Sequence, residues 1–88
     1  MDKKRYLLQK LTIIVKDEVV RAQKVEWYWR RSKNENDEEW RYLQKFAVPL
    51  TYSECEKIIK NEVGYAGHRM IFVGEWYLEE SFHIVKYE

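Results

Sequence analysis

Hydrophobic and polar positions alternate most clearly in residues 24–48. The alternation stops in the polar stretch 32–38 and then resumes. Its positions are Val25, Trp27 and Trp29 in the first run and Trp40, Tyr42, Gln44, Phe46 and Val48 in the second. A period of two with aromatic and β-branched side chains is typical of β-strands, so this region predicts two strands.

One antiparallel register of these two strands satisfies the aromatic rings and the charges together. Its pairs are Trp27–Tyr42, Trp29–Trp40, Arg30–Glu39 and Arg31–Glu38. Opposite charges that face each other across two strands contribute about 0.2–1 kcal/mol per pair. The register implies a tight turn at Asn34-Glu35, and a four-residue loop over 34–37 keeps the same aromatic face, so both connections stay open.

Residues 51–63 have the pattern of an amphipathic helix. Thr51 and Glu54 fit a capping box, as do Ser53 and Glu56, and Gly64 suits the left-handed residue that ends a helix. One face of the predicted helix carries the apolar residues Cys55, Ile58, Ile59 and Val63.

The two remaining segments each fit more than one arrangement. Residues 5–22 predict a strand pair that turns at 16–18, because 12–15 and 19–20 are mostly β-branched, while a helix over residues 2–11 is the alternative. Residues 68–87 predict two more strands. Their turn lies either at Gly74-Glu75 or at Glu79-Glu80 with a bulge at Gly74, and we favour the second placement.

These elements predict an α+β fold in a single domain over residues 1–88. The order is β-β-β-α-β-β, with a mostly antiparallel sheet and one helix, at about residues 52–63, packed on one face. The chain holds four Trp, seven Tyr and three Phe. Each ring buries roughly 150–250 Å², so a few of them can stabilise a domain of this length.

The aromatic hairpin also predicts a binding surface. Four exposed rings would exceed the apolar area that monomers usually tolerate, so we expect Trp27, Trp29, Trp40 and Tyr42 to point into the core. The opposite, exposed face then carries the candidate partner-binding residues. These residues are Tyr28, Arg30, Arg31 and Arg41, together with the acidic Glu38 and Glu39.

Cysteine usage and the N-terminus indicate an intracellular protein. Cys55 is the one cysteine, so an intrachain disulfide is impossible. The apolar part of the N-terminus is interrupted by Gln9 and Lys10 and is followed by no small-residue cleavage site, which is unlike a signal peptide. No apolar run approaches the roughly 20 residues that span a bilayer, so we expect a cytoplasmic protein.

The usual signatures of catalysis are missing from the sequence. Cys55 falls on the apolar helix face, as a buried small hydrophobe does. A zinc site would need Cys55, His68 and His83 to converge with a carboxylate without any short ligand spacing. We therefore expect no enzyme activity, no cofactor and no metal.

Charge narrows the choice of partner. The net charge is +1, but it is unevenly distributed. Residues 1–33 hold ten Lys/Arg and four Asp/Glu, whereas residues 34–88 hold six Lys/Arg and eleven Asp/Glu. Dedicated nucleic-acid binders are usually strongly basic, so a protein partner is the first hypothesis and nucleic acid the second. A homodimer that pairs the unlike halves is the third. Small charged, aromatic-rich domains also occur among inhibitors encoded by phages or mobile elements, which act by occluding a surface.

Overall fold

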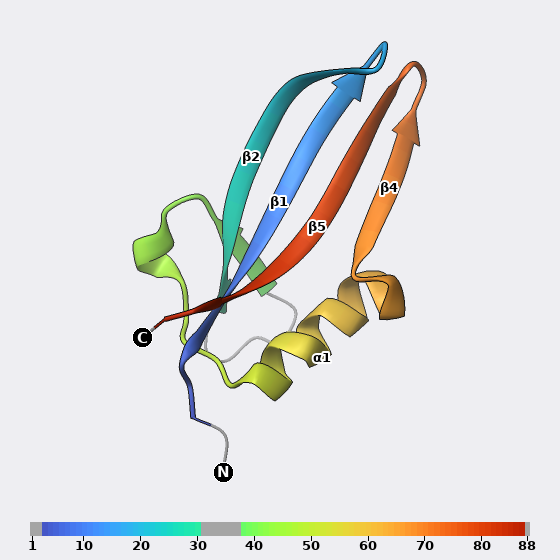
Figure 1. Cartoon of the computed structure of the whole chain (residues 1–88). Coiled ribbons are helices and arrows are strands. Elements are labelled where there is room, and N and C mark those ends of the chain that lie inside the picture. Colours follow the sequence, from blue (N-terminus) through green and yellow to red (C-terminus); the bar gives the residue numbers. More distant parts are fainter. Residues whose placement is uncertain (1–2, 31–37, 88) are drawn as a thin grey trace.

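The computed structural model describes residues 3–30 and 38–87 and contains one sheet and one helix. The strands are β1 (Tyr6–Lys16), β2 (Val19–Arg30), β3 (Glu38–Arg41), β4 (His68–Val73) and β5 (Trp76–Lys86), and the helix is α1 (Tyr52–Val63). The strand order is β3-β2-β1-β5-β4, with every pair antiparallel. The sheet curls into a half-barrel with α1 packed at one end (Figure 1), which confirms the predicted α+β fold.

The first strand pair confirms the prediction for residues 5–22. β1 pairs with β2 on one side and with β5 on the other, so a helix over residues 2–11 is wrong. Asp17 and Glu18 both have positive φ, at 54° and 63°, as a type I′ hairpin turn requires. This turn twists in the same sense as the strands that it joins.

The last hairpin turns at Gly74-Glu75, so the favoured placement at Glu79-Glu80 is wrong. Gly74 has a φ of 62° at the first central position, which glycine adopts at little cost. Glu79 and Glu80 lie inside β5, opposite Met70 and Arg69 of β4. The two glutamates therefore point to opposite faces of the sheet.

The β2–β3 pair forms in a register shifted by one residue from the predicted one. Tyr28 lies opposite Trp40, and Trp29 lies opposite Glu39. A one-residue slip moves each side chain to the other face. The shift is stabilised by ring contacts, because the centroid of Trp40 lies 5.5 Å from those of Tyr28 and Phe82.

The predicted strand over residues 40–48 is also too long. β3 ends at Arg41, and a short 3₁₀ turn follows at Gln44–Phe46. Tyr42 is 67% exposed, so its expected place in the core is wrong. The two possible connections at 34–37 lie outside the described residues.

Helix α1 begins and ends as the sequence predicts. The Thr51 hydroxyl accepts a hydrogen bond from the Glu54 amide at 3.1 Å, and the Glu54 carboxylate accepts one from the Thr51 amide at 2.9 Å. The helix ends before Gly64, which has a φ of 71°. This capping box satisfies two amides that the helix itself leaves without partners.

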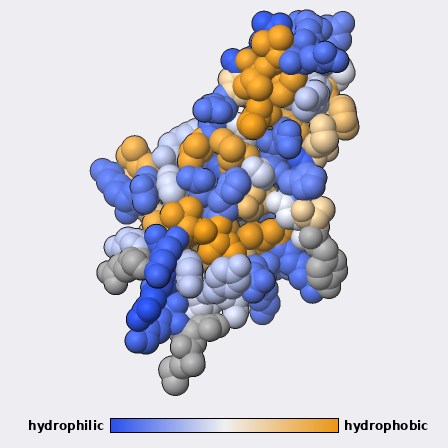
Figure 2. All heavy atoms as spheres, in the orientation of Figure 1, coloured by the Kyte–Doolittle hydropathy of each residue, from blue (hydrophilic) through white to orange (hydrophobic). Residues whose placement is uncertain are grey.

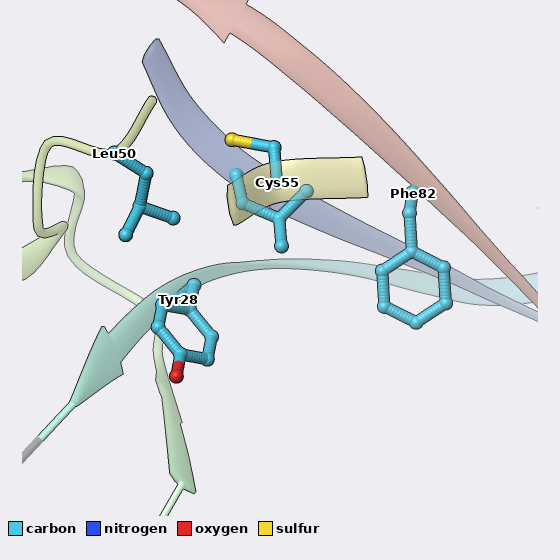
Figure 3. Packing of buried hydrophobic residues seen from close by; sticks show 5 residues of the cluster. Tyr28, Leu50, Cys55 and Phe82 are labelled. Atoms are coloured by element: carbon cyan, nitrogen blue, oxygen red, sulfur yellow. The ribbon is translucent and has the colours of Figure 1, made fainter. Parts of the chain in front are cut away.

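The core lies between α1 and one end of the sheet. Its buried members are Leu8, Tyr28, Leu50, Cys55 and Phe82, and Figure 3 shows the packing of this cluster. Leu8 and Cys55 are both 0% exposed. We call this end of the molecule the base.

The other face of the sheet is also covered at the base. Leu7 and Trp27 are buried there, although Trp27 had been expected on the same face as Trp40. Leu7 lines a shallow pocket with Gln44 and Ala47 of the segment that follows β3. The base therefore has cover on both sides of its strands.

Beyond the base, the two hairpins β1–β2 and β4–β5 extend side by side (Figure 1). We call residues 13–23 and 70–79 the arm. The molecule measures 46 × 27 × 26 Å along its principal axes, so it is clearly elongated. Within residues 3–30 and 38–87, no helix is long and apolar enough to cross a membrane.

Candidate functional site

The structure separates the residues that were predicted to bind a partner. Tyr28 is only 3% exposed and belongs to the core, so its predicted place on an exposed face is wrong. Arg30, Glu38 and Glu39 take their places in the β2–β3 pair, with Arg30 opposite Glu38. Arg31 lies outside the described residues.

Arg41 is half-buried and packed against aromatic rings. Its guanidinium carbon lies 4.5 Å from the centroid of Trp29 and 5.9 Å from that of Phe46. Such stacking holds the side chain against the sheet through cation–π attraction. In the described part of this hairpin, Arg41 and Trp29 form a packed layer, and Tyr28 contributes nothing to an exposed surface.

A cluster of charged residues crosses the sheet just above the base, on the face that α1 covers. We call this cluster the charged belt. It consists of Lys10, Lys24, Glu26, Arg69 and Glu80, which surround Thr12. The strand register explains why these charged residues lie close together. Thr12 of β1 lies opposite Lys24 on β2 and opposite Glu80 on β5.

Ion pairs connect the members of the charged belt. Lys10 Nζ lies 3.7 Å from a Glu26 oxygen and 3.9 Å from a Glu80 oxygen. Arg69 Nε donates a hydrogen bond of 2.7 Å to Glu80. Lys10 also lies 4.6 Å from the ring centroid of Trp40, which links the belt to the aromatic core.

The charges of the belt are layered by depth. The side chains of Glu26, Glu80 and Lys10 are 12%, 12% and 14% exposed, whereas those of Lys24 and Arg69 are 43% and 40% exposed. The two more exposed members of the belt are therefore both cations. A ligand that approaches this face meets the cations before the carboxylates.

The α1 side of the arm is apolar beyond the charged belt. Paired residues of neighbouring strands point to the same face, so the register defines two rows that run across the strands. The first row is Ala22, Ile14, Leu78 and Ile71. The second row is Val19, Lys16, Trp76 and Val73. We call these two rows the apolar arm face.

Much of the apolar arm face is open to solvent. Val19, Val73 and Trp76 are 50%, 58% and 39% exposed, and Ile71 is 37% exposed. Figure 2 shows hydrophobic side chains gathered along the arm towards its tip. Contiguous exposed apolar surface, bordered by polar residues, is typical of an interaction site.

The opposite face of the arm also exposes apolar side chains, but polar residues interrupt it. Val20, Met70 and Phe72 are 56%, 46% and 71% exposed there, and Phe72 lies against the Tyr77 ring at 5.8 Å. Gln23 and Glu79 stand in one of its two rows, and Val15 in the other row is buried. The apolar arm face carries four exposed large apolar side chains, against three on the opposite face.

Two titratable groups near the core have shifted pKa values. Burial, together with the charges of Glu54 and Glu56, raises the pKa of the Cys55 thiol to about 11, so the thiol stays protonated at neutral pH. The backbone amide of Thr51 lowers the pKa of Glu54. In the part of the chain that the structure describes, no group of three or more His, Cys, Asp and Glu could hold a metal ion.

Sequence analysis missed the apolar arm face, although a signal for part of it exists. Ile71 and Val73 alternate along β4, and Trp76 and Leu78 alternate along β5. Pairing them requires the turn at Gly74-Glu75. The favoured turn at Glu79-Glu80 placed all four residues in one strand, so they were not recognised as one surface formed by two paired strands.

The comparisons with known proteins add no name to this surface. No protein-family model matches the chain, and no curated protein or solved structure is similar to it.

Proposed function

We propose that the protein is a non-catalytic binding module and that its partner is another protein, which contacts the apolar arm face. The observation that carries this proposal is the exposure of Val19, Ile71, Val73 and Trp76 on one face of a well-paired sheet. A compact monomer of this size gains stability by burying such side chains. Their exposure on paired strands is explained if a partner covers them.

The chemistry of the rim favours one kind of protein partner. Lys16, Lys24 and Arg69 lie along the apolar arm face and its border, and their side chains are between 33% and 43% exposed. The matching surface has an apolar centre with carboxylates at its edge. Such rim charges act mainly on specificity and on the association rate.

The two rows also match the dimensions of a recognised binding mode. Four strands spaced about 4.8 Å apart measure about 14 Å from the first strand axis to the last, and an amphipathic helix of about 10 residues has this length. Helices commonly dock an apolar stripe on such a surface. By covering a surface of its partner, the module would act by occlusion, as small inhibitors from phages or mobile elements do.

Nucleic acid is a weaker candidate for this surface. Stacking proteins place aromatic rings beside cations in a positive groove. Here Tyr28 is buried, and Arg41 is packed against Trp29 and Phe46. The buried carboxylates of Glu26 and Glu80 also offset the cations next to the apolar arm face.

A photo-crosslinking amino acid at Val73 tests the proposal. In extract from the native cells, we expect one protein adduct at this position, and unlabelled wild-type protein should compete for it. The matched control places the same amino acid at the exposed Lys57 of α1, where no adduct is expected. Equal labelling at both positions, or adducts with nucleic acid alone, would refute a protein-binding arm.

A double variant then tests the surface itself. Val73→Lys with Trp76→Ser keeps both positions in their strands and removes apolar surface from the second row. As an unlabelled competitor, this variant should fail to displace the adduct. Competition equal to that of the wild-type protein would place the binding site elsewhere.

A further inference from the structure

The arm has two outer strand edges, and only one of them is protected against pairing. Beyond its contact with β3, the edge of β2 carries Arg21 at an irregularity in the β1–β2 register, with Lys24 and Glu26 further along. Bulges and charged side chains are the usual means by which sheet edges avoid pairing. In β4, residues 70–73 contain no charge and no proline, and their pairing with β5 is regular.

The backbone of β4 has donors and acceptors that point away from β5. In a two-residue hairpin, the residues next to the turn exchange hydrogen bonds, and these are Val73 and Trp76. Hydrogen-bonded and non-hydrogen-bonded pairs alternate along the two strands, so the backbone N–H and C=O groups of Met70 and Phe72 point away from β5 to the outer edge. Among residues 3–30 and 38–87, no strand pairs with this edge.

From this edge we infer that β4 pairs antiparallel with β4 of a second copy of the chain, which forms a two-fold dimer with one continuous sheet. Residues that lie opposite each other on two paired strands point to the same face of the sheet. One residue of β4 must therefore lie opposite its own copy, with the two-fold axis midway between the two copies. Centring the axis on Ile71 places Met70 opposite Phe72 of the second copy. The outward groups of both residues then meet, and each strand both donates and accepts.

Charge at the two ends of β4 favours this direction of pairing. Arg69 lies at the base end and pairs with Glu80, whereas Glu75 lies in the turn at the tip, 4.0 Å from Lys16, and its side chain is 81% exposed. Antiparallel pairing brings the tip of one copy beside the base of the other. The exposed Glu75 carboxylate of each copy therefore lies nearer to Arg69 of the neighbouring β4 than it would in a parallel arrangement.

The size of this contact indicates a weak dimer. A stable complex usually buries about 800 Å² on each partner, and one strand of six residues offers less than this. Dimerisation should therefore depend on concentration and appear between about 10 µM and about 1 mM. The apolar arm face remains open in this arrangement, so the dimer is independent of the proposed function.

A charge-swap experiment tests both the edge and the register. Ile71→Lys and Ile71→Glu each place two like charges directly opposite each other on the axis, which destabilises paired strands. Light scattering should show that each variant alone dissociates at least about tenfold more readily than the wild-type protein. An equal mixture of the two variants should recover the dimeric mass, because Lys then faces Glu.

The matched control is Val19→Lys, which adds the same charge to the apolar arm face on a strand that the dimer leaves free. This variant should keep the wild-type mass, and circular dichroism should show that all variants are folded. A wild-type protein that stays monomeric near 1 mM overturns the inference. So does a dimer that the Ile71 variants leave intact, or one that their mixture does not restore.

Discussion

The base and the arm share strands β1, β2 and β5, but the side chains on the α1 side of these strands are buried at the base and partly exposed in the arm. At the base, Leu8 of β1 is 0% exposed, because α1 and the aromatic rings cover it. Further along the same strand, Lys16 stands in a row with Val19 and Trp76, which are half exposed. The difference shows that cover, and not strand pairing, decides which part of this sheet stabilises the domain.

The charged belt marks the boundary between the two regions. Lys10, Glu26 and Glu80 are largely buried, and Lys10 lies against the Trp40 ring at the edge of the aromatic core. Buried ion pairs contribute little net stability, but removing one partner leaves a costly unpaired charge. The belt therefore holds the register of β2, β1, β5 and β4 where the apolar core ends.

The largest expected contrast lies between a core leucine and an arm valine. Leu8→Ala should lower the free energy of unfolding by about 2–5 kcal/mol, because it leaves a cavity in the base. Val73→Ala should change the free energy by less than about 0.5 kcal/mol, since Val73 is 58% exposed. Urea denaturation measures both, and similar losses would mean that the arm belongs to the core.

The next contrast compares the two neighbouring glutamates of β5. Glu80→Gln removes the carboxylate that pairs with Lys10 and Arg69, so it should cost about 2 kcal/mol. Glu79→Gln, on the opposite face, should cost less than about 0.5 kcal/mol. If the two substitutions had equal effects, the belt would have no role in the stability of the sheet.

The cap of α1 tests how firmly the base is covered. Thr51→Ala should cost about 1 kcal/mol, because it removes the hydroxyl that accepts from the Glu54 amide. The pKa of Glu54 is lowered in the folded state, so its contribution is present above its ordinary pKa and is lost as the pH falls through the lowered value.

Acid unfolding of the Glu54→Gln variant tests whether the Glu54 carboxylate stabilises the folded protein more at neutral pH than at acidic pH. The variant should lose less stability than the wild-type protein when the pH is lowered from neutral into this acidic range. A steeper loss in the variant would contradict the lowered pKa.

The last expected effect is a gain in stability. The Thr12 hydroxyl lies in the charged belt, is buried, and forms no hydrogen bond within the described residues. Thr12→Val keeps the shape and removes this polar group, so it should stabilise the protein by about 1 kcal/mol. Thermal unfolding measures the change, and a lower midpoint would show that the hydroxyl has a partner.

The local features of the fold could be predicted from the sequence. The capping box of Thr51 and Glu54 lies within one helical turn, and the hairpin at 17–18 joins two β-branched runs. Both features depend on residues close in the chain. For the same reason, the burial of Cys55 follows from the pattern of its helix.

The β2–β3 register could not be derived in this way. Trp27, Tyr28 and Trp29 are all aromatic, so either phase of the alternation looks apolar. The choice depends on Phe82, which lies far along the chain and contacts Trp40. The candidate surface was missed for a similar reason, because β1 pairs with the last strand of the chain and this pairing assembles both the belt and the arm.

Hydrogen exchange along β1 tests most directly whether the base is the more stable part of the sheet and the arm the less stable part. β1 pairs with β5 over residues 6–16 but with β2 only over residues 9–16, so any greater protection at residues 7–9 reflects their cover and not additional strand pairing. In dilute native protein, the amides of residues 13–15 should exchange through openings that cost at least about 1 kcal/mol less than those of residues 7–9. Equal protection, or slower exchange in residues 13–15, would contradict this division of the molecule.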